Sequence, residues 1–435
     1  MLSWATSQPL LATSAGFSFA EPYAVGLVFA GLVLFTAIWA LSSQHERALS
    51  PAAVYLLLGA LASGGLHLFG IGLLDPIEEA PLIERLSEFA VIVALFGAGL
   101  RLDRQLGWKR WRSTLLLIGV VMPVTIIAVA AFANVFMGLS LGAAIILGAA
   151  LAPTDPVLAR EVKVGPPGEG DGPETHFALT SEAGLNDGLA FPFVFLGIFV
   201  SAEGGFAWFS EWFAADVVYA IAVGLLIGVL GGRAIGAGSD WLRRRGWLKP
   251  QFDGWLALAS VLAIYGIAEV AGSYGFLAAF AGGLAFRRYE WDHEAHRRVH
   301  DGADLAENVT ELGMILLLGS TVTIAGLAAP GIAGWLLVPF LLLLVRPLAV
   351  AAAFVGSDVS RKERALIGWF GIRGIGSFYY AAVAINAGVL TTSETSIIFW
   401  TIIACVGVSI IVHGISARPA MSGINSKISK PGRHG

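Results

Sequence analysis

Long apolar segments are the feature that most limits how this chain can fold. Runs of about 18 to 25 apolar residues recur along it, and each is long enough to cross about 30 Å of hydrocarbon as a helix. Only 13% of the 435 residues are charged, and mean hydropathy is +0.76. Soluble domains carry roughly 25% charged residues. Unbroken apolar runs also exclude a membrane β-barrel, whose strands alternate in polarity. The sequence therefore predicts an all-α membrane protein.

The apolar runs predict thirteen spans with short connections. The expected spans are residues 22–41, 52–71, 86–100, 114–136, 139–160, 177–200, 214–233, 254–270, 274–287, 307–326, 332–356, 365–388 and 395–416. The transmembrane domain is then residues 22–416. Residues 1–21 form an N-terminal periplasmic tail, and residues 417–435 form a cytoplasmic C-terminal tail.

The positions of the basic residues agree with this count. With the N-terminus outside, 24 of the 27 Lys and Arg residues fall in inner loops or the C-terminal tail. Outer loops contain only Arg85, and Arg346 and Arg373 lie within spans. Positively charged loops stay in the cytoplasm. The sequence thus predicts a multi-pass protein of the plasma (inner) membrane, with its N-terminus outside and its C-terminus cytoplasmic.

Five ionisable residues lie deep within spans: Asp155, Glu182, Asp187, Arg346 and Arg373. Each costs about 2.5 to 3.5 kcal/mol by insertion scales, so such residues face protein and are functional by default. Three acids and two arginines leave one negative charge without a fixed partner. A bare carboxylate in this environment is disfavoured, so its site should hold a proton or a cation.

Helix geometry indicates which acid is the unmatched one. Asp187 is about 16 Å from the inner end of its helix, close to the middle of the bilayer. Glu182 and Asn186 share a helix face, whereas Asp187 points about 100° away from Asn186. We therefore expect Asp187 to carry the exchangeable ion and Glu182 to form a structural ion pair with Arg346. The alternative is that all five residues only lock helices together.

Two predicted spans contain helix-breaking residues. In the fifth span, Pro153 and Pro156 flank Thr154 and Asp155, and two prolines three residues apart should interrupt the helix. In the twelfth span, four glycines surround Arg373 and weaken helicity there: Gly368, Gly371, Gly374 and Gly376.

The two interrupted spans are seven apart in sequence order, so they should be oppositely oriented in the membrane. Spans one to six and eight to thirteen can then be two inverted repeats, and matched interrupted helices mark the binding site of a transporter. Opened helices expose positive N-terminal and negative C-terminal ends, which Asp155 and Arg373, respectively, can neutralise. Freed carbonyl groups near Thr154 could provide oxygen ligands to a small cation.

Several motifs resemble those of a known family. The chain resembles the monovalent cation/proton antiporter family, in its electroneutral sodium/proton exchanger (NhaP-type) branch, at T-D-P (Thr154–Pro156), E-x-x-x-N-D (Glu182–Asp187), Arg346, G-x-R-G (Gly371–Gly374) and LFGAGLRLD (Leu95–Asp103). The resemblance implies an NhaA/NhaP-like antiporter fold with two interrupted, crossing helices. It also implies a homodimer, with a dimerisation region of spans one to three and eight to ten. The core region would be spans four to six and eleven to thirteen.

The resemblance implies electroneutral Na+/H+ antiport by alternating access, with Asp187 carrying either the cation or the proton. The expected cation- and proton-binding residues are Asp187, Thr154, Asp155 and Asn186, with Asp187 and Thr154 as Na+ ligands. We expect no cofactor and no nucleic-acid partner. The expected ligands are the transported ions. Several family members have Ser directly after the glutamate, where this chain has Ala183. That departure leaves the coordination and the choice between sodium and potassium open.

Three alternatives remain at this stage. A K+/H+ antiporter would have the same fold. A passive cation channel or uniporter would need a continuous wet pore and would lack proton coupling. An intramembrane enzyme could use Ser409 and His413, which fall at helical spacing, but no G-x-S-x motif accompanies them. We therefore predict a transporter and not an enzyme.

Overall fold

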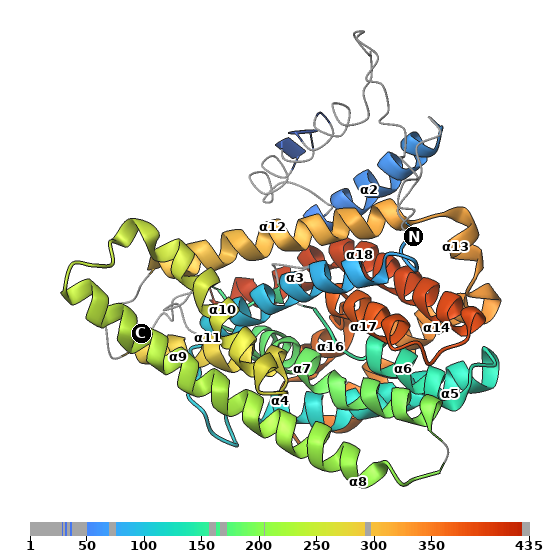
Figure 1. Ribbon diagram of the computed structural model, residues 1–435, viewed down its shortest axis with the longest axis horizontal. Helices are drawn as coiled ribbons and strands as arrows, with labels where there is room; N and C mark the ends of the chain where they lie inside the picture. The colour runs from blue at the N-terminus through green and yellow to red at the C-terminus, as the bar shows by residue number, and fades with distance from the viewer. Residues whose placement is uncertain are drawn as a thin grey trace, which may run out of the picture. The chain divides into compact units, whose positions relative to one another are not determined.

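All regular secondary structure in the described part of the chain is helical (Figure 1). The computed structural model describes residues 50–68, 75–155, 162–165, 172–203, 205–291 and 297–428, together with five isolated positions before residue 50. The chain divides into two compact units, Met1–Glu46 and Arg47–Gly435. Everything below concerns the second unit. The predicted N-terminal tail and almost all of the first span lie outside the described residues.

The described helices follow one another along the chain, and the connection between Leu151 and Glu174, 22 residues, is much longer than most others. In chain order they are α2 (Pro51–Leu68), α3 (Ala80–Arg101), α4 (Arg112–Leu116), η2 (Leu117–Val121), α5 (Met122–Phe136), α6 (Leu141–Leu151), α7 (Glu174–Ala202), α8 (Phe209–Trp212), η4 (Phe213–Tyr219), α9 (Ala220–Arg244), η5 (Pro250–Phe252), α10 (Asp253–Val270), α11 (Gly275–Trp291), α12 (Arg297–Thr321), α13 (Ile324–Ala328), α14 (Gly331–Pro339), η6 (Phe340–Val345), α15 (Arg346–Ala353), α16 (Arg361–Trp369), α17 (Ile375–Asn386) and α18 (Thr392–Ile428). The segments η2, η4 and η6 are π-helical turns that continue the neighbouring α-helices.

Each predicted span from 52–71 onward coincides with at least one helix, and several of these helices extend beyond the predicted span. Helix α12 begins at Arg297 rather than residue 307, α9 continues to Arg244, and α18 extends to Ile428 within the predicted tail. Charged and polar residues lower hydropathy at these ends without preventing helix propagation, so hydropathy alone places the boundaries too far inward. Six continuous helical segments of the described chain are long and apolar enough to cross a membrane. The total of thirteen stays a prediction.

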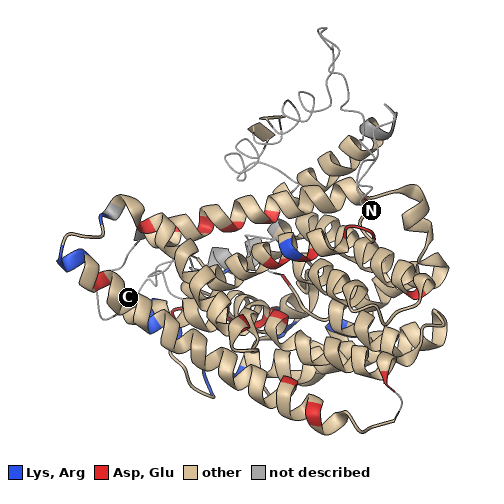
Figure 2. Ribbon diagram, in the orientation of Figure 1, with Lys and Arg blue, Asp and Glu red and all other residues tan. Residues whose placement is uncertain are grey.

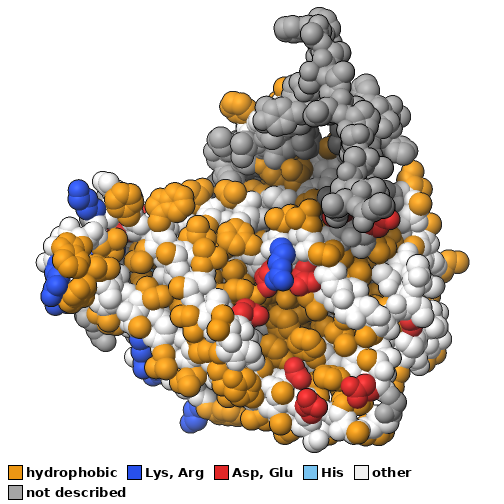
Figure 3. All heavy atoms as spheres, viewed as in Figure 1, with side chains coloured by type: hydrophobic (Ala, Val, Ile, Leu, Met, Phe, Trp, Pro, Cys, Tyr) orange, Lys and Arg blue, Asp and Glu red, His pale blue; other side chains and the backbone are white. Residues whose placement is uncertain are grey.

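The outer surface carries apolar side chains where a soluble protein would be polar. Leu226, Leu230, Val270 and Ile324 are all more than half exposed. Figure 3 shows apolar side chains spread over most of one face with few charges among them. Figure 2 shows lysines and arginines on the ribbon around the connection between α9 and α10. This is the surface expected of a multi-pass membrane protein.

The buried helices approach one another closely. Helix α3 packs against α11, α12 and α17, and α6 packs between α5 and α7. At the α3–α11 contact, a Cβ on Gly99 would meet the Phe280 carbonyl, and a Cβ on Gly283 would meet the Phe96 carbonyl. Small residues allow such backbone contacts, which stabilise helix association in lipid through van der Waals packing.

The two helix breaks expected from the sequence lie next to each other. Helix α6 ends at Leu151, directly before the non-helical residues 152–155, while Pro156 lies outside the described residues. Residues 370–374 separate α16 from α17. The Asp155 N–H donates to the Ile372 carbonyl at 2.7 Å. A backbone hydrogen bond therefore joins the non-helical segment after α6 to the non-helical segment between α16 and α17.

Candidate functional site

Helix α7 carries the three polar residues that the sequence singles out. Glu182, Asn186 and Asp187 are all buried, with Asp187 8% exposed. Their helical spacing places them around α7 so that Glu182 and Asn186 contact partners on other elements, described next, while Asp187 lines a separate cavity. One helix thus connects the ion pair, the interrupted segment and the cavity.

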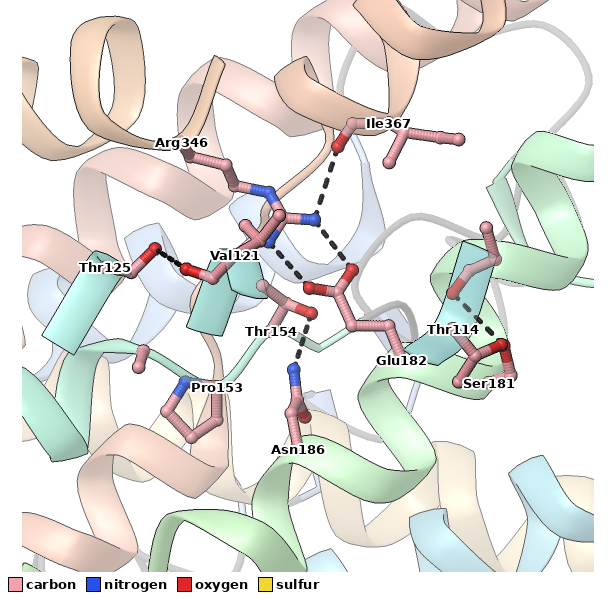
Figure 4. A network of polar contacts seen from close by, with 12 residues as sticks. Thr114, Val121, Thr125, Pro153, Thr154, Ser181, Glu182, Asn186, Arg346 and Ile367 are labelled. Atoms are coloured by element: carbon pink, nitrogen blue, oxygen red, sulfur yellow. Dashed lines mark hydrogen bonds and ion pairs between the residues drawn. The ribbon is translucent and has the colours of Figure 1, made fainter. Parts of the chain in front are cut away.

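Glu182 and Arg346 form a bidentate ion pair. The two guanidinium nitrogens Nη1 and Nη2 lie 2.8 and 2.7 Å from the carboxylate oxygens, and each side chain is 2% exposed (Figure 4). Nη2 also donates to the Ile367 carbonyl at 3.2 Å. Arg346 follows the π-helical turn η6 and precedes Pro347, which has no N–H to donate. Paired, bidentate geometry is what makes two buried charges tolerable.

Asn186 joins α7 to the interrupted segment after α6. Its Nδ2 donates to Thr154 Oγ1 at 2.9 Å, and Figure 4 shows the two side chains pointing toward each other. Asn186 Oδ1 is buried and has no hydrogen-bond partner among the described residues. The contact fixes the side chain of Thr154, a residue that also lines the cavity at Asp187.

Arg373 and Asp155 lie at opposite kinds of helix end. The Arg373 guanidinium donates to the carbonyls of Ala152 and Pro153, the latter at 3.1 Å, directly beyond the C-terminus of α6. The Asp155 carboxylate lies against Gly374, the residue that caps the N-terminus of α17, where an added Cβ would overlap it. A positive group near exposed carbonyls and a negative group near exposed N–H groups both stabilise broken helices.

Asp187 occupies a different electrostatic position from Glu182. Within the described part of the chain, no lysine or arginine forms a hydrogen bond or salt bridge with its carboxylate. The Asp187 main-chain carbonyl accepts a hydrogen bond from the Tyr380 hydroxyl. The carboxyl group therefore remains available to a ligand, while the backbone beside it is held by α17.

The cavity at Asp187 is small and lies between α3, α7, α12, the segment after α6 and the start of α17. Its lining comprises Ala90, Val91, Ala94, Leu95, Ala98, Thr154, Asp155, Ala183, Gly184, Asp187, Glu311 and Ile375. It encloses ≈ 20 Å³, room for about one water molecule. Of the predicted binding residues, Asp187, Thr154 and Asp155 line the cavity. Asn186 does not line it but holds the side chain of Thr154 by a hydrogen bond.

Glu311 is a cavity residue that the sequence prediction missed. It lies on α12 and is buried, four residues inside the predicted span 307–326, but it was not counted among the deep ionisable residues. The missed signal was the spacing of Glu307 and Glu311, four residues apart, directly before the apolar run LGMILLL. No group of three or more His, Cys, Asp or Glu suited to a metal ion occurs in the described residues.

The Ser409–His413 pair has a structural environment. Ser409 Oγ lies 3.1 Å from His413 Nδ1, but it also accepts the Arg373 backbone N–H at 2.9 Å. The His413 ring packs against Trp369 and Phe370. The pair thus supports the non-helical segment between α16 and α17.

The chain is similar to sodium/proton antiporters over most of its length. It is 26% identical over 375 residues to Na(+)/H(+) antiporter 2 of Zygosaccharomyces rouxii, covering 78% of this chain and 45% of that protein. It is 27% identical over 314 residues to the Na(+)/H(+) antiporter ApNhaP of Aphanothece halophytica, covering 66% and 56%. The chain thus spans less than half the length of the yeast relative.

The fold is similar to that of a solved antiporter structure. The sodium proton antiporter MjNhaP1 from Methanocaldococcus jannaschii, at pH 8, superposes with a TM-score of 0.68 at 18% identity, covering 91% of this chain and 100% of that one. Residues 22–423 match the family described as sodium/hydrogen exchanger, transmembrane. The chain therefore belongs to the sodium/hydrogen exchanger family, a family of membrane transporters and not of enzymes.

Proposed function

We propose that this chain is a secondary-active, electroneutral Na+/H+ antiporter in which Asp187 binds the cation and the proton in turn. The observation that carries the proposal is the contrast between two carboxylates on α7. Glu182 is held by both nitrogens of Arg346, whereas Asp187 lies in a small cavity without a basic partner among the described residues. Family membership and the names of the relatives support the same ions.

The cavity provides oxygen groups of the kind that small cations bind. We assign Asp187 and Thr154 as Na+ ligands and Asp155 as a neighbouring member of the binding set. Asn186 holds the Thr154 hydroxyl from outside the cavity. The volume requires the ion to enter with little of its hydration shell, so protein oxygens must replace the lost water.

Coupling follows from the charge of Asp187. Either a proton or one monovalent cation neutralises it, and moving the empty carboxylate across a low-dielectric barrier would be strongly unfavourable. The transport domain therefore changes sides only when loaded, and one cation exchanges for one proton. Because protons compete for the same carboxylate, lowering the pH raises the apparent KM for the cation.

Matched distortions in the two halves support inverted repeats. The π-helical turn η2 is followed by Met122–Pro123 in predicted span four, and η6 is followed by Arg346–Pro347 in predicted span eleven. These spans are seven apart, as are the two interrupted spans. We propose thirteen spans in two inverted repeats, with the N-terminus outside and the C-terminus in the cytoplasm.

We assign spans four to six and eleven to thirteen to a moving core. This division follows the site: α6, α7, α15 and the α16–α17 break together hold the polar residues described above. We assign spans one to three and eight to ten to the dimerisation region of a homodimer. The core would move relative to this region to expose Asp187 alternately on each side.

The test is proton movement in liposomes that contain the purified protein and an internal pH-sensitive dye. Addition of Na+ should move protons, and a voltage clamp with K+ and valinomycin should leave the rate unchanged. Li+ and K+ additions then measure selectivity. A response to K+ but not Na+ would replace the proposal with K+/H+ antiport, and cation flux without proton movement would replace it with a channel or uniporter.

A further inference from the structure

We propose that the contact between Lys163 and Glu307 is a latch that closes the cavity at Asp187 toward the C-terminal end of α3, and that it opens in every transport cycle. The inference rests on the proposed function, because a latch that opens in every cycle requires alternating access. The latch belongs to a group of charged residues outside the binding set, which we call the ionic cluster: Arg101, Lys163, Asp304 and Glu307.

Glu307 is the centre of the ionic cluster. Lys163 Nζ lies 2.5 Å from Glu307 Oε1, and Arg101 Nη2 lies 2.6 Å from Glu307 Oε2. Arg101 Nη2 also contacts Asp304 Oδ1 at 2.5 Å. Each oxygen of Glu307 therefore has its own cation, so Arg101 can still compensate Glu307 when Lys163 leaves.

The ionic cluster continues directly from the cavity along two helices. On α3, Arg101 is three residues beyond the cavity residue Ala98. On α12, Glu307 is four residues before the cavity residue Glu311. Residues three or four apart share a helix face. Arg101 and Glu307 therefore lie on the same side of the cavity. The charge pattern predicts that this side is cytoplasmic.

Asp304 is 53% exposed, but the other three residues of the ionic cluster are almost completely buried and close that end. The side chains of Glu307, Lys163 and Arg101 are only 1%, 8% and 11% exposed. A hydrated cation therefore has no wide passage between them. An ion moving between the cavity and this end requires the group to separate.

The latch joins two parts that the proposed cycle moves apart. Lys163 lies in the connection between α6 and α7, where the Val164 N–H donates to Thr180 Oγ1 of α7 at 3.1 Å. Val164 is buried, so the described part of this connection, residues 162–165, is held on the helix that carries Asp187. Glu307 lies on α12, in the predicted dimerisation region. Movement of α7 relative to α12 must break the Lys163–Glu307 contact first.

Reversible cross-linking tests the latch. Cys405 is the single cysteine, so Cys405→Ala gives a cysteine-free chain into which Lys163→Cys and Glu307→Cys are introduced together. A short bis-methanethiosulfonate reagent joins the pair, and a reductant releases it. Cross-linked protein in liposomes should lose Na+/H+ exchange to the level of empty liposomes and recover it after reduction. Exchange at the uncross-linked rate by protein shown by mass to be joined would overturn the latch.

A second ion pair provides a matched control. Arg243 of α9 and Asp253 of α10 lie 2.7 Å apart and join two consecutive predicted spans outside the core. The same reagent on Arg243→Cys/Asp253→Cys should leave exchange unchanged. Equal inhibition of both cross-linked pairs would mean that rigidity in general, not the latch, stops transport, and would overturn the proposal.

A labelling measurement tests closure without relying on transport. In the cysteine-free chain, Ala98→Cys places a thiol in the cavity wall, and a hydrophilic maleimide reports its access to water. Adding Lys163→Gln should increase the labelling rate by about tenfold, since one charge-assisted contact is lost. An unchanged rate would refute closure by Lys163. Because labelling needs no exchange, this result stands even if the wild-type chain moves no protons, which would instead refute the proposed function.

Discussion

Arg346 and Glu182 neutralise each other where neither has access to water. Both are almost completely buried, and the pair is held by two hydrogen bonds. Arg346→Ala leaves the Glu182 carboxylate buried and uncompensated, which should destabilise the protein by about 3 to 5 kcal/mol. Thermal unfolding in detergent checks this. The double variant Arg346→Leu/Glu182→Leu, which removes both charges, should recover much of the loss. Arg346→Ala with an unchanged Tm would contradict the structural role.

The resemblance to the exchanger family leads us to expect Ser directly after Glu182, where this chain has Ala183. It lines the cavity one helical turn from Asp187. Ala183→Ser adds a hydroxyl oxygen and should lower the apparent KM for Na+ about threefold to tenfold, corresponding to roughly one added polar contact. Ala183→Val adds volume without an oxygen and should instead slow exchange. Equal effects of Ser and Val on the KM would show that the position contributes only packing.

The charged residues of the site were predictable because charge inside an apolar run is conspicuous. Asp155, Glu182 and Asp187 stand out in the sequence for that reason. Glu307 and Glu311 did not, because they stand at the start of the predicted span 307–326, before its apolar run, where an acid resembles a residue at the membrane surface. Only the fold shows that α12 begins ten residues before the predicted span and that Glu307 and Glu311 lie in the protein interior. Hydropathy reports the average polarity of a segment, whereas the proposed ion binding depends on which face of its helix a charged side chain occupies.

At the scale of the helices, the non-helical segment after α6 and the one between α16 and α17 approach each other closely at Gly374. An added Cβ there would overlap the Asp155 carboxylate, and Gly374 caps the N-terminus of α17. Gly374→Ala should push Asp155 from its position, reducing exchange more than about tenfold and destabilising the protein by about 1 to 3 kcal/mol. Exchange in liposomes and thermal unfolding check both effects.

Gly407 provides the control for the Gly374→Ala substitution. It lies in α18, and a Cβ there would meet Leu56 at an ordinary 3.8 Å. Gly407→Ala should leave exchange unchanged and stability unchanged or slightly higher, since alanine favours the helix. If Gly374→Ala behaved like Gly407→Ala, the close approach of the two non-helical segments would not depend on that contact.

Local sequence predicted where the helices break but not how the breaks meet. Proline and glycine act on their own helix, so interruptions near Pro153 and Gly374 could be inferred directly. The Asp155–Ile372 hydrogen bond joins segments more than 200 residues apart and depends on the packing of the whole bundle. The π-helical turns also escaped prediction, since Pro123 and Pro347 indicate distortion but not its type.

For the molecule as a whole, the distribution of basic residues predicts the orientation in the membrane. Green fluorescent protein fused after residue 435 should fluoresce, because the C-terminus is predicted to be cytoplasmic. Alkaline phosphatase fused after Gly138, between α5 and α6, should be active, because that connection is predicted to lie outside. An inactive phosphatase together with a dark fluorescent fusion, in proteins shown to be expressed, would reverse the orientation.

The most direct test of the central claim is exchange by Asp187→Asn, which keeps the size of the side chain but removes its charge. In liposomes, Na+-driven proton movement should fall to the level of empty liposomes, while the Tm stays close to that of the wild type. Asp216→Asn, which removes a carboxylate beside Tyr274 and away from the cavity, should retain exchange. Na+/H+ exchange by Asp187→Asn at a rate near the wild-type value would contradict the assignment of Asp187 as the carrier.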